Sequence, residues 1–236
     1  MEPVAHLYTN LSGKFGLPRQ AGIVPEFKGR IVFTEQYRNP DALRGLESFS
    51  HIWILWLFSE SPTEDVPVMV RPPRLGGNAK KGVFASRSPF RPNGIGMSVV
   101  RMDSIDFDTP EGPVITVSGP DLMSGTPILD IKPYMPYSDS IPEASAGYTK
   151  GLSDLFLTVE FPDELLQKFP PENREELVAL LHLDPRPQYQ RDPDRVYGLT
   201  YLDYDVRFRI DDKDVLTVCE VVRTLENCKH FYIFDF

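Results

Sequence analysis

Cysteine, histidine and long apolar runs are all scarce in this sequence. Two cysteines among 236 residues give no basis for a disulfide framework or a zinc site. The four histidines are scattered without metal-ligand spacing, so we expect no metal. The longest apolar run, residues 51–58, is far shorter than the ~20 residues that a membrane span requires. Because the start of the chain also lacks a leader-like pattern, we expect a cytoplasmic protein that stays out of membranes.

The glycine-rich motifs of the common nucleotide-binding folds are also missing. Gly94 and Gly96 begin a G-x-G-x-x-G pattern, but Val99 stands at its third glycine position and no βαβ unit follows. Residues 76–82 lack the G-K-[ST] of a P-loop, and no G-x-S-x-G is present. A Rossmann fold is therefore not expected.

Acidic residues outnumber basic ones, yet one window of the chain is strongly basic. The net charge of −9 argues against general nucleic-acid binding. Residues 66–102 nevertheless hold seven cations and no Asp or Glu, so this window carries +7 and the rest of the chain −16. A single basic window in an acidic chain is typical of a dedicated anion site, for example one for phosphates.

Proline is abundant, at 23 residues, which favours short elements and shaped loops over long helices. The apolar run 51–58 is expected to be a strand buried on both faces. Residues 41–49 are expected to form a helix that opens at Asp41. Further strand-like runs recur at short spacing and predict a β-barrel or a β-sandwich: residues 29–37, 82–86, 97–102 and 113–119.

The pattern changes to helical periodicity after residue 160. Leucines over residues 163–182 predict two helices, divided at Pro170-Pro171, with Pro171 at the start of the second. Residues 204–210 alternate between apolar and polar, and with residues 215–222 they predict a β-hairpin, on which Cys219 would act as an inert small hydrophobe. We therefore predict two domains, residues 1–155 and a smaller α+β domain over residues 160–236.

Residues 82–96 combine two arginines with many turn-forming residues. Arg87 and Arg91 have no acidic neighbour in sequence, and the prolines and glycines around them fix the backbone or allow a close approach. Rigid loops that carry guanidinium groups suit carboxylate or phosphate recognition. The plainer alternative is a strand followed by a tight turn with solvated arginines. Residues 121–140 are either a second wall of that site or a long solvated loop.

Several segments together resemble the TrmO family, also called TsaA-like. They are residues 18–22, 41–55, 71–98, 121–136 and 184–189, so the resemblance spans nearly the whole chain. It implies S-adenosylmethionine-dependent methylation of N6 of threonylcarbamoyl-adenosine, which lies next to the anticodon of threonine tRNA. It also implies a mainly β fold, with a small non-Rossmann β-barrel and a smaller α+β domain, and a homodimer that contacts the anticodon stem-loop.

The resemblance further implies a set of cofactor-binding residues. Ser59 and Glu60 stand where relatives often have His-Gln, and a glutamate can accept from ribose hydroxyls or an adenine amine. The whole set consists of Arg19, Gln20, Ser59, Glu60, Arg87, Ser124, Gly125, Thr126 and Pro127.

Chemistry suggests residues that act on the acceptor. Methyl transfer needs in-line positioning, and the urea-like N6 is a poor nucleophile, so removal of its proton should help. Asp130 is the candidate base, with His51 as a further candidate. Tyr134 or Lys132 would orient the carbamoyl group.

The remaining substrate contacts are with an anion and with an unpaired base. Arg74 or Arg91 would clamp the threonyl carboxylate. The splayed-out base would stack on Phe90, Tyr134 or Tyr137. Two other function classes stay open: a non-catalytic tRNA-binding module, and a methyltransferase of another small anionic molecule.

Overall fold

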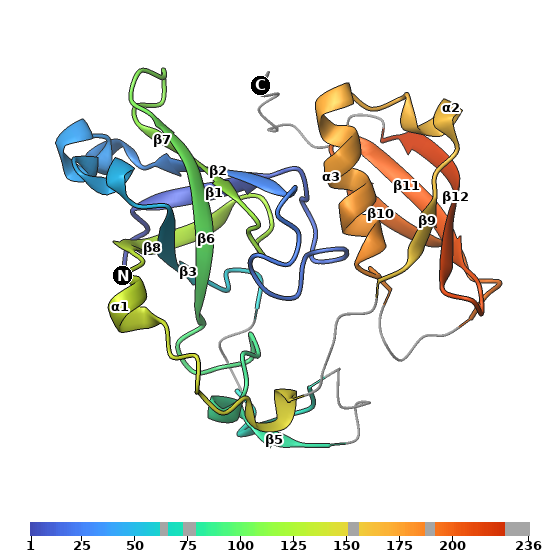
Figure 1. Cartoon of the computed structure of the whole chain (residues 1–236), viewed down its shortest axis with the longest axis horizontal. Coiled ribbons are helices and arrows are strands. Elements are labelled where there is room, and N and C mark those ends of the chain that lie inside the picture. Colours follow the sequence, from blue (N-terminus) through green and yellow to red (C-terminus); the bar gives the residue numbers. More distant parts are fainter. Residues whose placement is uncertain (62–65, 73–78, 151–155, 187–191, 225–236) are drawn as a thin grey trace.

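A closed six-stranded antiparallel barrel forms the N-terminal part of the molecule (Figure 1). The structure, a computed structural model, describes residues 1–61, 66–72, 79–150, 156–186 and 192–224. Neighbouring barrel strands follow the order β1-β2-β7-β6-β3-β8. Their bounds are β1 Ala5–Thr9, β2 Lys28–Phe33, β3 His51–Leu57, β6 Ile95–Asp106, β7 Val114–Ser118 and β8 Thr126–Pro133. The expected mainly β fold with a barrel is therefore confirmed.

Strand β3 shows how the barrel uses its apolar residues. Ile52, Ile54 and Trp56 point into the barrel core, whereas the alternate positions on the outer wall are only half-buried. The expectation of a strand buried on both faces was wrong, because a barrel strand has one face in the core and one face outside. The outer positions are nevertheless apolar, at Trp53, Leu55 and Leu57.

Two local expectations in the barrel half were also wrong. Residues 41–49 form two 3-10 helices, Pro40–Leu43 and Leu46–Ser48, because Gly45 between them has a left-handed φ of 90°. The first is capped by Asn39 rather than by Asp41. Residues 82–86 are mostly a 3-10 helix, Val83–Ala85; only Lys81–Gly82 (β5) pair, with Met69–Val70 (β4).

The C-terminal part is an α+β unit, as expected. Two helices, α2 (Asp163–Leu166) and α3 (Pro171–His182), are separated at Pro170-Pro171 as predicted. The predicted hairpin is β11 (Tyr204–Ile210) with β12 (Val215–Arg223). The four-stranded sheet is completed by β10 (Tyr197–Tyr201) and β9 (Thr158–Glu160), in the order β10-β11-β12-β9. Cys219 on β12 is exposed, so it does not act as a core hydrophobe.

Two hydrophobic cores stabilise the molecule. One fills the barrel, and the other lies under α3 and the C-terminal sheet. The second core also takes in Leu11, Val24 and Phe27, which come from the connection between β1 and β2. The division into residues 1–155 and 160–236 stays a prediction. In the described ranges, no helix is long and apolar enough to cross a membrane.

Candidate active site

Four segments from the connections between barrel strands meet at one end of the barrel. They are residues 10–27, 58–61, 86–94 and 119–125. The strand registers bring them together: Leu57 at the end of β3 pairs with Ile95 at the start of β6, and Ser118 at the end of β7 pairs with Lys28 at the start of β2. These connections carry all of the residues implied for the cofactor except Thr126 and Pro127, which begin β8.

Asp121 is the side chain that links these connections. Its Oδ1 accepts the hydroxyl of Ser98 at 2.6 Å, and the Ser98 oxygen accepts the indole N–H of Trp56 at 3.1 Å. The backbone N–H of Ala21 also donates to the Asp121 carboxylate. Burial raises the pKa of Asp121, although these hydrogen bonds and the nearby charge of Arg87 oppose the rise. A largely buried carboxylate therefore joins β3, β6 and two of the connections.

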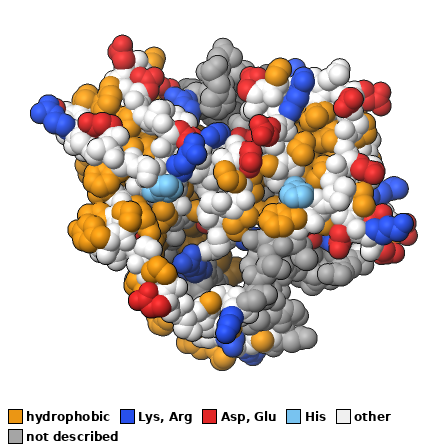
Figure 2. All heavy atoms as spheres, in the orientation of Figure 1, with side chains coloured by type: hydrophobic (Ala, Val, Ile, Leu, Met, Phe, Trp, Pro, Cys, Tyr) orange, Lys and Arg blue, Asp and Glu red, His pale blue; other side chains and the backbone are white. Residues whose placement is uncertain are grey.

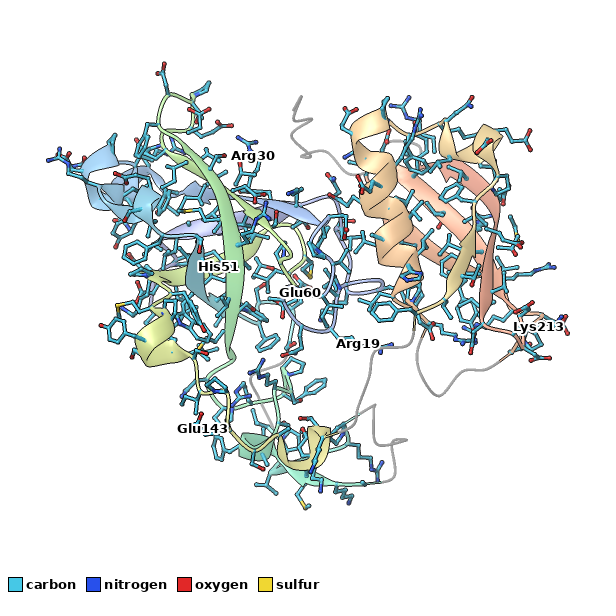
Figure 3. All side chains as sticks on the ribbon, in the orientation of Figure 1. Arg19, Arg30, His51, Glu60, Glu143 and Lys213 are labelled. Carbon is cyan, nitrogen blue, oxygen red and sulfur yellow. The ribbon has the colours of Figure 1, made fainter. Side chains whose placement is uncertain are left out.

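Arg87 and Gln20 are in direct contact. Nη1 of Arg87 donates to Oε1 of Gln20, and Nε2 of Gln20 donates to the carbonyl of Arg19 at 2.5 Å. Residues that lie 67 positions apart in sequence are thus side by side. Arg19 extends toward the C-terminal unit (Figure 3), where its Nη2 donates to the carbonyl of Asp184 at 3.4 Å.

Arg91 shapes the loop that carries Arg87. Its Nη1 donates to the carbonyls of Ser86 at 3.1 Å and Ser88 at 3.5 Å. Gly94 then turns the chain with a φ of 57°, and its carbonyl accepts the N–H of Phe58 at 2.8 Å. The structure contains the expected turn at Asn93-Gly94, and the anion-binding role of this loop stays a prediction.

The other implied cofactor residues lie at the same end. Ser124 donates its N–H to Leu11, and Gly125 donates its N–H to Leu7, both at 2.8 Å. Ser59 and Glu60 are exposed after β3. The carbonyl of Glu60 accepts Nζ of Lys14 at 2.6 Å, which ties residues 58–61 to residues 10–27 (Figure 3).

The residues expected to act on the acceptor lie on the wall and at the other end of the barrel. Asp130 and Lys132 form an exposed ion pair of 2.8 Å on the outer face of β8. Tyr134 follows β8 at the opposite end of the barrel, where its N–H donates to the carbonyl of His51 at 3.0 Å. At ~3.3 Å per residue, Tyr134 is roughly 25 Å from Thr126 along the strand. Tyr134 and the residues implied for the cofactor therefore lie at opposite ends of the barrel, with Asp130 and Lys132 on the wall between them.

The cations of the basic window do not form one cluster. Arg87 and Arg91 lie at the end of the barrel that carries the implied cofactor residues, but Lys81 lies over the ring of Tyr148 at 5.3 Å. Arg101 is held on the barrel wall by Asp103 at 2.9 Å. Arg74 lies outside the described residues. In the part of the chain that the structure describes, no group of three or more His, Cys, Asp and Glu could hold a metal ion.

Sequence reasoning did not assign Asp121 and Ser98 to the site. Asp121 opens the segment 121–140, which the sequence left as either a second wall of the site or a long solvated loop, and its partner Ala21 lies 100 residues away in sequence. Ser98 occupies a core-facing position of β6 among apolar residues. A polar side chain is buried in a barrel core only when it has hydrogen-bond partners. This single polar residue in an apolar strand was the sequence signal that could have pointed to a buried hydrogen-bond network.

Comparison with known proteins identifies the family. A model of the tRNA-methyltransferase O N-terminal domain matches residues 6–140, and a model of the TrmO C-terminal domain matches residues 155–224. The chain belongs to the TrmO family. The resemblance read from the sequence is therefore confirmed.

Individual TrmO relatives match over most of the chain. A tRNA (adenine(37)-N6)-methyltransferase of Escherichia coli K12 is 40% identical over 207 residues, which cover 84% of this chain and 88% of the relative. A putative S-adenosylmethionine-dependent methyltransferase, RcsF, of Pseudomonas aeruginosa is 36% identical and covers 94% of this chain and 96% of its own. The crystal structure of TrmO from P. aeruginosa superposes with a TM-score of 0.74 at 32% identity, over 94% of this chain and 95% of that one.

Proposed function

We propose that this chain is an S-adenosylmethionine-dependent tRNA methyltransferase. It acts on N6 of the adenosine at position 37, in the threonylcarbamoylated form found in threonine tRNA. The observation that carries the proposal is the cluster of Gln20, Arg87 and Asp121 at one end of a non-Rossmann barrel, in a chain of the TrmO family. The names of relatives from E. coli and Homo sapiens state tRNA (adenine(37)-N6)-methyltransferase activity. We expect the enzyme to act in the cytoplasm.

The side chains at this end of the barrel fit the groups of the cofactor. Arg87 is exposed, and its guanidinium suits the carboxylate of S-adenosylmethionine. Gly125 has a φ of 84°, and a Cβ added there would meet nothing within 4 Å, so a ligand has room against this backbone. The exposed oxygens of Ser59 and Glu60 can accept from ribose hydroxyls or from the adenine amine. When bound, S-adenosylmethionine supplies the methyl group from its sulfonium.

A homodimer would bring the acceptor residues to the cofactor of a second copy. Asp130 and Met97 both pair with Leu55, one on each side of β3, so all three side chains belong to the outer wall of the barrel. The side chain of Met97 is 52% exposed although it is apolar. Hydrophobic side chains also lie at the surface over the barrel half in Figure 2. We therefore propose that this wall packs against a second chain.

Within that arrangement, each acceptor residue has one role. Asp130 takes the proton from N6, and Lys132 or Tyr134 orients the carbamoyl group. Arg91 clamps the threonyl carboxylate, because a guanidinium has five N–H donors and its Nη1 contacts with Ser86 and Ser88 use only part of them.

A methylation assay tests the proposed function. The protein is incubated with labelled S-adenosylmethionine and total tRNA from cells with and without threonylcarbamoylation, and nucleosides are resolved by mass spectrometry. We expect methylated threonylcarbamoyl-adenosine only with the modified tRNA. Cofactor binding without label in tRNA would indicate a small-molecule methyltransferase instead. tRNA binding that is indifferent to S-adenosylmethionine would indicate a non-catalytic module.

A further inference from the structure

The connection between β1 and β2 carries Arg19 and Gln20, but its own core lies in the C-terminal unit. Leu11, Val24 and Phe27 are each at most 3% exposed, and they pack in the same cluster as side chains of α3 and the C-terminal sheet. Partly buried side chains of the same connection join this cluster, at Phe15, Leu17 and Ile23. Residues 10–27 therefore lie against the C-terminal unit as well as across the end of the barrel (Figure 1).

One buried carboxylate holds both ends of this connection. Oε1 of Glu176 on α3 accepts Nδ2 of Asn10 at 2.9 Å, and Oε2 accepts the backbone N–H of Lys28 at 3.1 Å. The hydroxyl of Tyr201 also donates to Oε1 at 2.8 Å. Glu176 is only 4% exposed, so these three donors replace its hydration. The carbonyl of Asn10 in addition accepts the N–H of Leu202 at 3.0 Å.

The middle of the connection is also set against the C-terminal unit. Gly16 has a φ of 84°, and a Cβ added there would lie 2.4 Å from Cδ1 of Leu199 on β10. The carbonyl that accepts Arg19 belongs to Asp184, a non-glycine residue held at a φ of 52°. Arg186 bonds to the Asp184 carboxylate at 3.1 Å and to Asp214 at 2.7 Å. A buried ion pair thus stabilises the strained residue that receives Arg19.

We propose that the C-terminal unit is the platform that shapes residues 10–27 for S-adenosylmethionine, with Glu176 as its main positioning residue. This inference rests on the proposed function, because it takes Arg19 and Gln20 as cofactor contacts. Glu176 itself does not touch the cofactor. It acts through Asn10 and Lys28, by keeping both ends of the connection in the conformation that presents Arg19 and Gln20.

The expected change in affinity for S-adenosylmethionine depends on how many molecules hold residues 10–27 in the binding conformation. If only a fraction of molecules hold the connection in place, the apparent Kd rises by the inverse of that fraction. Glu176→Gln leaves one oxygen acceptor, so its NH2 group faces either the N–H of Lys28 or the donors of Asn10 and Tyr201, and one end of the connection loses its acceptor. We expect this variant to bind S-adenosylmethionine about tenfold more weakly, with KM for the cofactor raised and kcat at saturation nearly unchanged.

The experiment compares full-length proteins by calorimetric titration with S-adenosylmethionine. Val218→Ala is the matched control, because Val218 is buried in the same core but lies on β12, two strands away from β10 in the sheet. We expect Val218→Ala to lower the Tm at least as much as Glu176→Gln while its Kd stays within about twofold of the unmodified chain. Equal weakening in both variants would overturn the proposal, and so would unchanged binding in Glu176→Gln.

A second readout does not depend on the cofactor. Amide hydrogen exchange over residues 11–27 should become faster in Glu176→Gln and stay unchanged in Val218→Ala. If the unmodified chain failed to bind S-adenosylmethionine, the proposed function would fail, and the exchange data would still show whether Glu176 holds the connection. Protection of residues 11–27 that is the same in all three proteins would overturn the platform itself.

Discussion

The hydroxyl of Ser98 donates to Oδ1 of Asp121 at 2.6 Å, and this contact joins the inside of the barrel to the end that carries the proposed cofactor residues. Asp121 is a largely buried carboxylate whose partners come from three separate parts of the chain, including the backbone of Ala21. Its charge faces Arg87, which itself holds Gln20. Asp121 thus links the barrel core to the Arg87–Gln20 pair.

Replacing Asp121 by Asn should weaken cofactor binding. The change keeps the side-chain shape but removes the negative charge near Arg87 and gives the Ala21 N–H a weaker acceptor. We expect the Kd for S-adenosylmethionine to rise about tenfold, or ~1.4 kcal/mol, in a calorimetric titration. Ser98→Ala is the control, since it removes the two hydrogen bonds of the Ser98 hydroxyl, to Asp121 and from Trp56, costs about 2 kcal/mol of stability and keeps the charge. Equal rises in Kd for the two variants would mean that the charge is irrelevant.

Arg91→Ala should distinguish a substrate clamp from a loop brace. A clamp predicts that binding of threonylcarbamoylated tRNA weakens by roughly 2 kcal/mol, while binding of unmodified tRNA changes little. A brace that only holds the carbonyls of Ser86 and Ser88 predicts the same loss for both tRNAs. Filter binding with the two tRNA forms at one salt concentration measures the difference.

Gly96→Ala should destabilise the barrel. A Cβ at Gly96 would lie 2.3 Å from the indole of Trp56, so β3 and β6 would have to separate or the ring would have to move. Overpacking of this kind costs about 1–3 kcal/mol, which denaturant unfolding would detect. Gly82→Ala is the matched control, because a Cβ there meets nothing within 4 Å. A Gly96→Ala protein as stable as the control would show that the indole ring moves freely.

Asp103 and Glu176 should give the folded state opposite pH dependences. Burial would raise the pKa of Asp103, but hydrogen bonds from Lys28, Ser118 and Arg101 lower it below its usual value of 3.8. Its stabilising contribution is therefore present above pH 3.8 and is lost as the pH falls through the folded pKa. Burial raises the pKa of Glu176 above 4.5, so its contribution is present below that pH and is lost as the pH rises through the folded pKa.

Urea unfolding between about pH 3 and pH 8 measures both effects. The unmodified chain should lose its advantage over Asp103→Asn toward acid pH. Its free energy of unfolding relative to Glu176→Gln should instead decline as the pH rises. The same slope for both comparisons would contradict a lowered pKa at Asp103 together with a raised pKa at Glu176.

Elements with a clear period could be predicted from the sequence, whereas long-range placement could not. Residues 204–210 alternate because one face of β11 is buried, and that local pattern correctly predicted the strand. The run 51–58 carries apolar residues on both faces, and sequence alone does not distinguish a strand in the middle of a buried sheet from a barrel wall that is only half-buried. Gly45 divides the expected helix 41–49 because its backbone adopts a positive φ. The spacing of apolar residues, on which the helix was predicted, does not report the φ of a single glycine.

In the candidate site, too, some residues could be predicted from the sequence and their long-range contacts could not. Family resemblance named Gln20 and Arg87 together, and the structure brings the two side chains into contact, while their role toward the cofactor stays a prediction. The contact of Asp121 with Ala21 could not be read from the sequence, because it spans 100 residues and depends on barrel closure. The roughly 25 Å between Tyr134 and Thr126 was equally hidden, since neighbours in a motif can lie at opposite ends of a strand.

The shared core of residues 11–27 has a consequence for synthesis on the ribosome. All barrel strands have been translated by Pro133, but α3 and β10–β12 emerge only afterwards. At ~5–20 residues per second, the roughly 90 residues up to Arg223 take about 5–20 seconds. During that interval Leu11, Val24 and Phe27 have no completed core to enter. All six barrel strands are thus available before the core that takes in these three side chains exists, and under the proposed role of the C-terminal unit, ligand binding at this end of the barrel waits for translation of β10–β12.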